Sequence, residues 1–362
     1  MPGLPFVIGD ASRAASALVA GGLAGYGLAA AAVAARGFRR GLADCWSTLA
    51  CGITLLGCAA AMLRWGPALV PAPFGTFAVL AMAFGVLYAV LFVALRLQVA
   101  VDWTHTIVQR TFRVPIPDLA HEERRKLPHL AMGLNSLVPL GLGHAVLVVA
   151  AAAAPVVAMP GETWGNLLVA RAASWHAGGE VVLFCSLLLL ILVLAPIELL
   201  RLAFPGLAYP WKRIIEPLLR AREAGLFGGH LHMAAGVTFA ALVLARRGDL
   251  DRAAWPTLAV ILVAVFADAA SALVGMRIGR TKWRHNANKS HAGTVGGTVA
   301  AFALATPLVG IPLGLATAAW FLVVDVAAPV PVAISDNLLN PIGLAALYVW
   351  GADLVQPMVG LR

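Results

Sequence analysis

Charged residues are scarce in this chain, and their scarcity excludes most soluble folds. Only 12% of the 362 residues are Asp, Glu, Lys or Arg, whereas a soluble domain carries about a quarter. So few charges cannot coat a surface that faces water, and 61% of the residues are hydrophobic. They suffice if lipid solvates most of the exterior. The composition therefore predicts an integral membrane protein.

Cysteine is also rare, and its spacing argues against a thiolate metal centre. The four cysteines lie in or beside apolar runs and form no Cys-x-x-Cys pair: Cys45, Cys51, Cys58 and Cys185. We therefore interpret them as small apolar residues. A basic segment before the first apolar run is also missing, so that run is predicted to be a membrane helix rather than a signal peptide.

Long apolar runs are what the chain has in abundance. A bilayer core of about 30 Å needs roughly 20 apolar residues per helix. Runs of this kind lie near 14–35, 45–63, 74–95, 134–158, 179–204, 228–245, 255–274, 293–312, 315–334 and 338–357. No strand-like alternation competes with them. The prediction is an all-α, polytopic transmembrane helical bundle of about ten spans, and the prolines from Pro307 to Pro331 are compatible with broken helices near the C-terminus.

The basic residues are concentrated in four loops. These loops hold 19 of the 26 Lys and Arg residues, within 36–40, 96–126, 201–222 and 277–289. Ten spans would place all four on one side of the membrane, which the positive-inside rule identifies as cytoplasmic. The exception is the group Arg246, Arg247 and Arg252, which ten spans would place on the opposite side. Although the net charge is +9, basic residues in short loops between apolar runs do not indicate a nucleic-acid partner.

One acidic residue, Asp268, lies inside an apolar run. An ionised carboxylate in hydrocarbon costs a few kcal/mol or more unless it is paired or hydrated. Asp268 is therefore a candidate for a functional site. The alternative is a polar residue that bonds to a neighbouring helix.

The segment after Asp268 contains groups that suit phosphate oxygens. They are Gly275, Gly279, Lys282, Asn288, Lys289, Ser290 and Gly293. Glycines let a backbone approach closely, and amides at a helix start, lysines and a hydroxyl bind phosphates. Two alternatives stay open. Gly275 and Gly279 also fit a small-xxx-small helix contact, and the basic residues also fit anchors to lipid headgroups.

Together these groups indicate phosphate chemistry. A carboxylate in a hydrated pocket can hold Mg²⁺, which usually takes one or two carboxylates plus substrate phosphates. Lysines and amides would neutralise the rest of a triphosphate, and phosphoryl or nucleotidyl transfer needs mainly positioning and charge stabilisation. A membrane enzyme of this kind would take a lipid acceptor from the bilayer and a nucleotide from the cytoplasm.

The spacing of these residues resembles the shared core of a known superfamily, that of polyprenol (dolichol) kinases, phytol kinases and phosphatidate cytidylyltransferases. Three more segments resemble the kinase branch: 125–129 with Lys126 and His129, 223–232, and 336–341 with Asp336 and Asn337. The resemblance covers roughly 120–345. It divides the chain into N-terminal transmembrane helices of unassigned role, 1–100, and a kinase-like catalytic region, 101–362.

The resemblance implies that CTP donates its γ-phosphate to a long-chain isoprenoid alcohol (dolichol, polyprenol or phytol-like), with Mg²⁺ as cofactor. It implies a catalytic set of Asp268, Lys282, Lys289 and Asp336, with Asp268 and Asp336 on the metal. The nucleotide would contact Gly275, Gly279, Lys282, Asn288, Lys289, Ser290, Gly293 and Asn337. Lys126 and His129 would lie near the phosphates or the acceptor. The expected partners are nucleotide, lipid alcohol and membrane lipid at a cytoplasmic active site, and a homodimer is left open.

Two departures and two alternatives accompany this reading. The family usually has an acid before the glycine of its core loop, where this chain has Ala292, and Asp325 stands where a glutamate is expected. A phosphatidate cytidylyltransferase is one alternative, but the segment at 336–341 favours the kinase. A transporter or non-catalytic scaffold is the other, and the gathering of charge at one face rather than along a midplane path disfavours it.

Two further groups have local interpretations. Arg201 follows Glu198 by about one helical turn, which predicts an ion pair. His230 and His232 are two residues apart and point to different faces of a helix, so they do not form a zinc pair.

Overall fold

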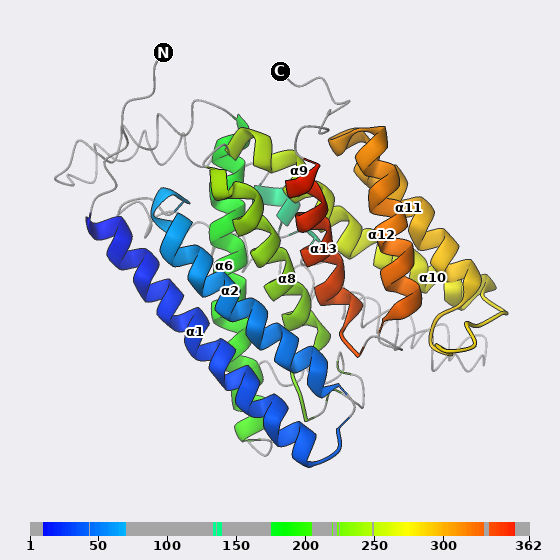
Figure 1. The fold of residues 1–362 in the computed structure, drawn as a ribbon, viewed down its shortest axis with the longest axis horizontal. Helices are drawn as coiled ribbons and strands as arrows, with labels where there is room; N and C mark the ends of the chain where they lie inside the picture. The colour runs from blue at the N-terminus through cyan, green and yellow to red at the C-terminus, as the bar shows by residue number, and fades with distance from the viewer. Residues whose placement is uncertain are drawn as a thin grey trace, which may run out of the picture.

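The computed structural model describes residues 10–42, 44–69, 133–134, 136–139, 175–204, 219, 223, 225–247, 250–328 and 333–351. Within these ranges every regular element is a helix, and the only strand-like pairing is an isolated bridge between Lys282 and Ser290. The predicted all-α class is thus confirmed for the described residues (Figure 1).

The N-terminal part is a hairpin of two long helices, α1 (Asp10–Arg39) and α2 (Cys45–Leu69). The chain reverses through Gly41, whose φ of 67° favours glycine. Gly27 and Gly52 face each other across the hairpin, because a Cβ on either would lie 2.8 Å from the other's carbonyl oxygen. Small residues therefore let these two helices approach closely, as is common in membranes.

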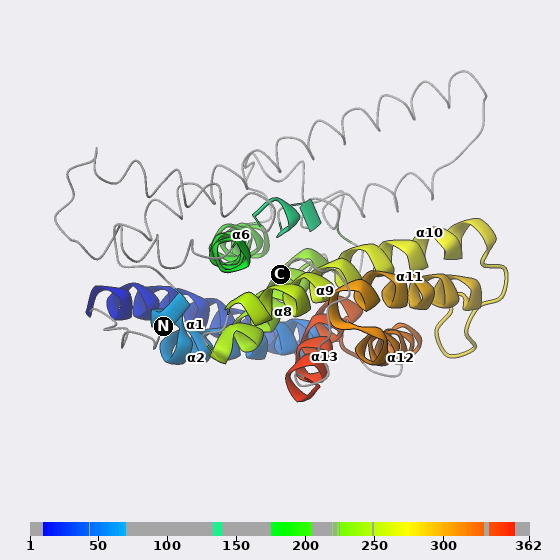
Figure 2. The ribbon, with the colours of Figure 1, turned by 90° about the horizontal axis from the view of Figure 1, so that it is seen from above.

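The central helices are α6 (Trp175–Ala203) and α8 (Gly229–Leu244). They are followed by a continuous helical rod made of α9 (Leu250–Leu262), a π-helical turn (Val263–Ala267) and α10 (Asp268–Ile278). Seen from above, α8 and α9 lie between the α1–α2 hairpin and the C-terminal helices, with α6 over them (Figure 2). The rod carries Asp268 away from the centre toward the C-terminal helices.

The C-terminal helices are α11 (His291–Val309), α12 (Ile311–Ala327) and α13 (Asp336–Trp350). Gly310, with φ of 87°, makes the sharp turn between α11 and α12. Pro307 does not break α11, and Pro312 lies in the first turn of α12, where a missing N–H costs little. Neither of these two prolines breaks a helix, and the chain reverses at the glycine instead.

Among the described residues, five segments are long and apolar enough to cross a membrane: Ser16–Arg39, Cys45–Gly66, Val182–Ala203, Ala253–Ile278 and His291–Val309. The helices Gly229–Leu244 and Ile311–Ala327 are apolar but shorter. The predicted span 74–95 lies outside the described residues, as does nearly all of 134–158. The structure therefore supports an integral membrane protein, and the count of ten spans stays a prediction.

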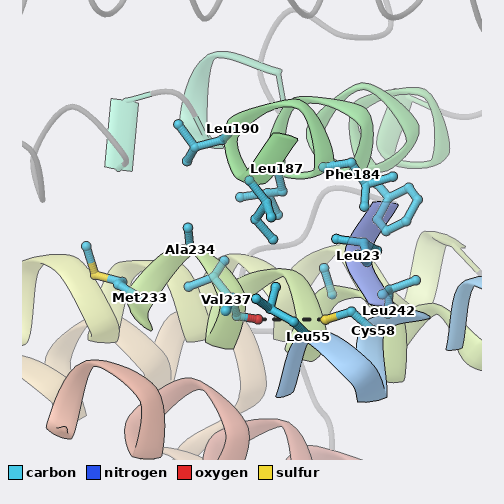
Figure 3. Close-up of a cluster of buried hydrophobic side chains, with 14 of the residues drawn as sticks. Leu23, Leu55, Cys58, Phe184, Leu187, Leu190, Met233, Ala234, Val237 and Leu242 are labelled. Carbon is cyan, nitrogen blue, oxygen red and sulfur yellow. Dashed lines mark hydrogen bonds between the residues drawn. The ribbon is translucent and has the colours of Figure 1, made fainter. Parts of the chain in front are cut away.

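The N-terminal hairpin shares its core with the central helices. Leu23 of α1 and Leu55 of α2 pack with Leu187 of α6 and Val237 of α8, all fully buried (Figure 3). The Cys58 thiol points at the carbonyl oxygen of Ala235, 4.0 Å away. All four cysteines are buried and free, in keeping with their interpretation as small apolar residues.

One end of the bundle gathers the described basic loops. The α1–α2 turn, the start of α8, the loop 279–290 and the start of α13 all lie toward the lower part of Figure 1. Gly37, beside Arg36, contacts the Leu226 side chain just before α8. Arg246 follows α8 at its other end. Among the described residues, the basic α1–α2 turn and the basic loop 279–290 therefore lie toward one end, while Arg246 and Arg247 lie at the other.

Candidate functional site

Asp268 begins α10 directly after the π-helical turn Val263–Ala267. A π turn inserts an extra residue and re-aims the side chains that follow, and such turns are frequent at functional sites. The Asp268 side chain is 8% exposed, so its carboxylate is turned into the protein rather than toward lipid.

The loop 279–290 is a compact hairpin between α10 and α11. The Trp283 amide donates to the Lys289 carbonyl oxygen at 3.1 Å, and the His291 amide to that of Thr281 at 3.0 Å. The buried Asn286 donates through Nδ2 to the carbonyl oxygen of Ala328, 3.0 Å away. These bonds fix the hairpin against the end of α12 and give Lys289 a defined position.

Lys289 bridges carboxylates from two helices. Its Nζ lies 2.6 Å from Asp325 Oδ1 on α12 and 2.8 Å from Asp336 Oδ2 on α13. Burial by itself lowers the pKa of Lys289, but attraction to Asp336, Asp325 and Asp268 outweighs it and holds the pKa above its ordinary value. The lysine is therefore a permanent cation among three carboxylates.

Asp325 is the most tightly held of these acids. It is 1% exposed, and its Oδ2 accepts a 2.6 Å hydrogen bond from the Thr294 hydroxyl of α11. The Ser271 hydroxyl of α10 approaches both carboxylate oxygens, at 3.3 and 3.4 Å. In the sequence, Asp325 stood out only as a departure from a family pattern. The signal that could have found it is the one that singled out Asp268, an acid inside an apolar run.

Asp336 and Asn337 occupy the first turn of α13. Ser335 caps this helix by accepting from the Asn337 amide, which also donates to Asp336 Oδ1 at 3.0 Å. A carboxylate is favoured at a helix N-terminus. Asn337 Nδ2 approaches the Gly229 carbonyl oxygen at 3.4 Å, linking α13 to the start of α8. The structure thus brings together Asp268, Lys289 and Asp336, which the sequence reading had placed in one site.

The glycines of the predicted phosphate loop serve a helix contact in the structure. Ser290 caps α11 by accepting from the Gly293 amide at 3.1 Å. A Cβ on Gly275 or on Gly293 would lie 2.9 Å from the Ser290 hydroxyl, and one on Gly279 would collide with it. This is the close packing that the small-xxx-small alternative describes, while a contact of these residues with nucleotide stays a prediction.

The other predicted site residues are exposed or lie outside the described residues. Lys282 and Asn288 are exposed on the hairpin, and Lys126 and His129 fall in a part that the structure does not describe. Among the described residues, no three of His, Cys, Asp and Glu gather into a group that could hold a metal ion by themselves.

A second buried polar cluster supports the start of α8. The predicted ion pair is confirmed, with Arg201 Nη2 2.7 Å from Glu198 Oε2. His230 Nε2 lies 3.2 Å from Glu198 Oε1, and the Gly228 amide donates to Oε2 at 3.0 Å. Sequence spacing could not reveal these last two partners, because they come from a segment about 30 residues away. The cluster fixes the backbone that meets Asn337.

No protein-family model matches this chain, and no curated protein or solved structure matches it either.

Proposed function

We propose that the chain is a membrane lipid kinase that transfers the γ-phosphate of CTP to a long-chain isoprenoid alcohol. The observation that supports this most is the partly buried Lys289, held at 2.6 and 2.8 Å from carboxylates of two different helices. An ammonium for phosphate oxygens and acids for a metal ion are the groups that phosphoryl transfer requires. The nucleotide and the acceptor class come from the motif resemblance.

The acidic residues fit a magnesium ion that arrives with a nucleotide. Asp325 and Asp336 already converge on one cationic atom, and Mg²⁺ commonly takes one or two carboxylates plus phosphates. The Asp336 side chain is 13% exposed and that of Asp325 only 2%. Asp336 is therefore the more accessible of these two acids. It is the proposed metal ligand together with Asp268, which the motif resemblance assigns to the metal, and the bound ion would neutralise charge on the phosphates.

The contacts assign different roles to the two partners of Lys289. Asp325 is held by Thr294 and Ser271, so it stays with the lysine as a fixed anchor. Asp336 lies at the start of α13 and is the partner that Lys289 exchanges when a phosphate arrives. The lysine then keeps one carboxylate and offers its remaining protons to phosphate oxygens, as a compact point charge.

The lipid alcohol reaches this cluster from the side of α11 that faces outward. Val295 and Val299 are each 61% exposed, and they follow the Lys289 hairpin by one and two helical turns. An apolar chain can lie along them while its hydroxyl approaches the charged end. Ala292 supplies no carboxylate at the start of α11, so the hydroxyl proton would go to whichever of Asp268 and Asp336 the metal leaves free. The surrounding basic residues favour the cytoplasmic side for this end.

Labelled CTP tests the proposal and separates it from its alternatives. The purified chain in lipid nanodiscs is incubated with γ-labelled or α-labelled CTP and a panel of prenols and phosphatidate. We expect γ-label on a prenol. Label from the α-position on phosphatidate would instead show a cytidylyltransferase, which uses the same kind of charges. Absence of transfer from any nucleotide to any lipid would contradict both and favour the transporter or scaffold.

The variant Asp268→Asn is expected to abolish transfer while the protein still inserts and purifies normally. It keeps the size of the side chain but removes the charge that faces Lys289. Asp44→Asn, in the α1–α2 turn, is the matched control and should keep wild-type activity. If Asp268→Asn were as active as Asp44→Asn, Asp268 would have no role in the transfer.

A further inference from the structure

A chain of three hydrogen bonds links the side chain of Trp283 to the ammonium of Lys289. The indole Nε1 of Trp283 donates to the Thr294 hydroxyl at 3.0 Å. That hydroxyl donates to Asp325 Oδ2 at 2.6 Å. The other carboxylate oxygen, Oδ1, accepts from Lys289 Nζ at 2.6 Å. None of the residues before Asp325 in this chain belongs to the site predicted from sequence.

The direction of the bonds from Trp283 to Asp325 follows from chemistry alone. An indole N–H can only donate, and an ionised carboxylate can only accept. The Thr294 hydroxyl must therefore accept from Trp283 and give its single proton to Asp325. Bonds aligned in this way polarise one another and are stronger in a poorly hydrated interior, and Thr294 is 1% exposed.

Trp283 also holds the other end of Lys289. Its backbone amide donates to the Lys289 carbonyl oxygen at 3.1 Å, across the hairpin. Lys289 is therefore restrained at its backbone by the Trp283 amide and at its ammonium by the relay that starts at the Trp283 indole. The ring itself stacks on His291, with centroids 4.0 Å apart. Stacking alone would leave the direction of the N–H open, so the hydrogen bond is a separate constraint.

We propose that Trp283 and Thr294 are positioning residues for Lys289, which act by fixing the orientation of Asp325. This inference rests on the proposed function, since it assigns Lys289 to the phosphates. Thr294 engages Oδ2 at 2.6 Å and so leaves Oδ1 facing the lysine, while Ser271 approaches both oxygens more loosely, at 3.3 and 3.4 Å. Without the relay only the longer Ser271 bonds restrain the carboxylate, which can then turn and release Lys289 from its position.

Acetylation of lysines tests the relay without requiring any activity. The full chain is purified in nanodiscs, treated briefly with an acetylating reagent, and each lysine is quantified by mass spectrometry. Lys289 is 17% exposed and ion-paired, whereas Lys282 in the same hairpin is exposed and serves as the internal reference. We expect Thr294→Val and Trp283→Phe to raise the Lys289 rate relative to Lys282, by about tenfold, as for loss of a hydrogen bond to a charge.

Two further variants make the test specific to the relay. Thr294→Ser keeps the hydroxyl and should leave Lys289 protected. The double variant Trp283→Phe/Thr294→Val should react no faster than Thr294→Val alone, because both changes break the same series of bonds. If the two residues had independent structural roles, their effects on the Lys289 rate would multiply instead. Multiplied effects, or an unchanged Lys289 rate in both single variants, would overturn the inference.

Kinetics distinguishes failure of the relay from failure of the proposed function. If the wild type transfers label, Thr294→Val should raise the KM for CTP by about tenfold and Thr294→Ser should restore it. A wild type that transfers label with unchanged KM in Thr294→Val overturns the relay alone. A wild type that transfers nothing overturns the proposed function, while the acetylation rates still decide the relay.

Discussion

At the scale of single residues, the charge of Lys289 controls the electrostatics of the site. Asp325, Asp336 and Asp268 all attract it, and Asp325 is almost completely buried. Removing one partner of a buried pair leaves an uncompensated charge and costs about 3–5 kcal/mol. The lysine is thus expected to matter for stability as well as for phosphate binding.

The raised pKa of Lys289 gives a pH dependence with a definite sign. Its ion pairs contribute fully below the unfolded lysine pKa of about 10.4 and are lost as pH rises through the higher folded value. We expect the difference in melting temperature between wild type and Lys289→Met to be constant between about pH 8 and pH 10 and to shrink only above that. A difference that stays constant above pH 10 as well would show an ordinary pKa, and a difference that grows as pH rises would show a lowered one.

Residue types and spacing singled out Asp268 and Lys289, and the motif resemblance added Asp336, but neither predicted how the three are arranged. An acid in an apolar run and a lysine in a short loop stand out in the sequence. The pairing of Lys289 with Asp325 and Asp336 joins positions 36 and 47 residues apart, and depends on how three helices pack. The relay through Trp283 and Thr294 could not be predicted for the same reason, since an aromatic residue in a loop and a hydroxyl in a helix are both common.

At the scale of elements, the contact between α10 and α11 sets the geometry of the hairpin that carries Lys289. Gly275 and Gly293 face each other there, with a Cβ on Gly293 only 3.0 Å from the Gly275 Cα. Hydropathy predicted the existence of both helices. It could not predict the π turn before Asp268 or the reversal at Gly310, because these depend on local backbone geometry rather than on apolar periodicity.

Gly293→Ala is expected to force α10 and α11 apart. The new Cβ would lie 2.6 Å from the Ser271 carbonyl oxygen, and overpacking of this kind costs about 1–3 kcal/mol. Gly21→Ala in α1 is the matched control, because nothing lies within 4 Å of its Cβ position, and it should stabilise α1 by about 0.5–1 kcal/mol. Thermal unfolding in detergent measures both changes. A Gly293→Ala protein as stable as wild type would contradict the close contact.

At the scale of the whole molecule, two loops with basic residues lie toward the same end of the bundle. The α1–α2 turn with Arg39 and the hairpin with Arg284 lie toward one end, and Arg246 lies at the end of α8 that points away from them (Figure 1). A nucleotide-dependent enzyme needs its site on the side where the nucleotide is. The proposed function therefore requires the end with Lys289 to face the cytoplasm.

Single-cysteine labelling in sealed vesicles tests this orientation. The native cysteines are buried and free, so they give a low background with a membrane-impermeant maleimide. Arg39→Cys and Arg284→Cys should be labelled only in inverted vesicles, and Arg246→Cys only in right-side-out vesicles. Labelling of Arg39→Cys and Arg284→Cys from opposite sides would contradict the shared end seen in the structure. Labelling of both from outside would agree with the shared end but would place Lys289 on the side opposite the cytoplasmic nucleotide. That result would contradict the lipid kinase proposal.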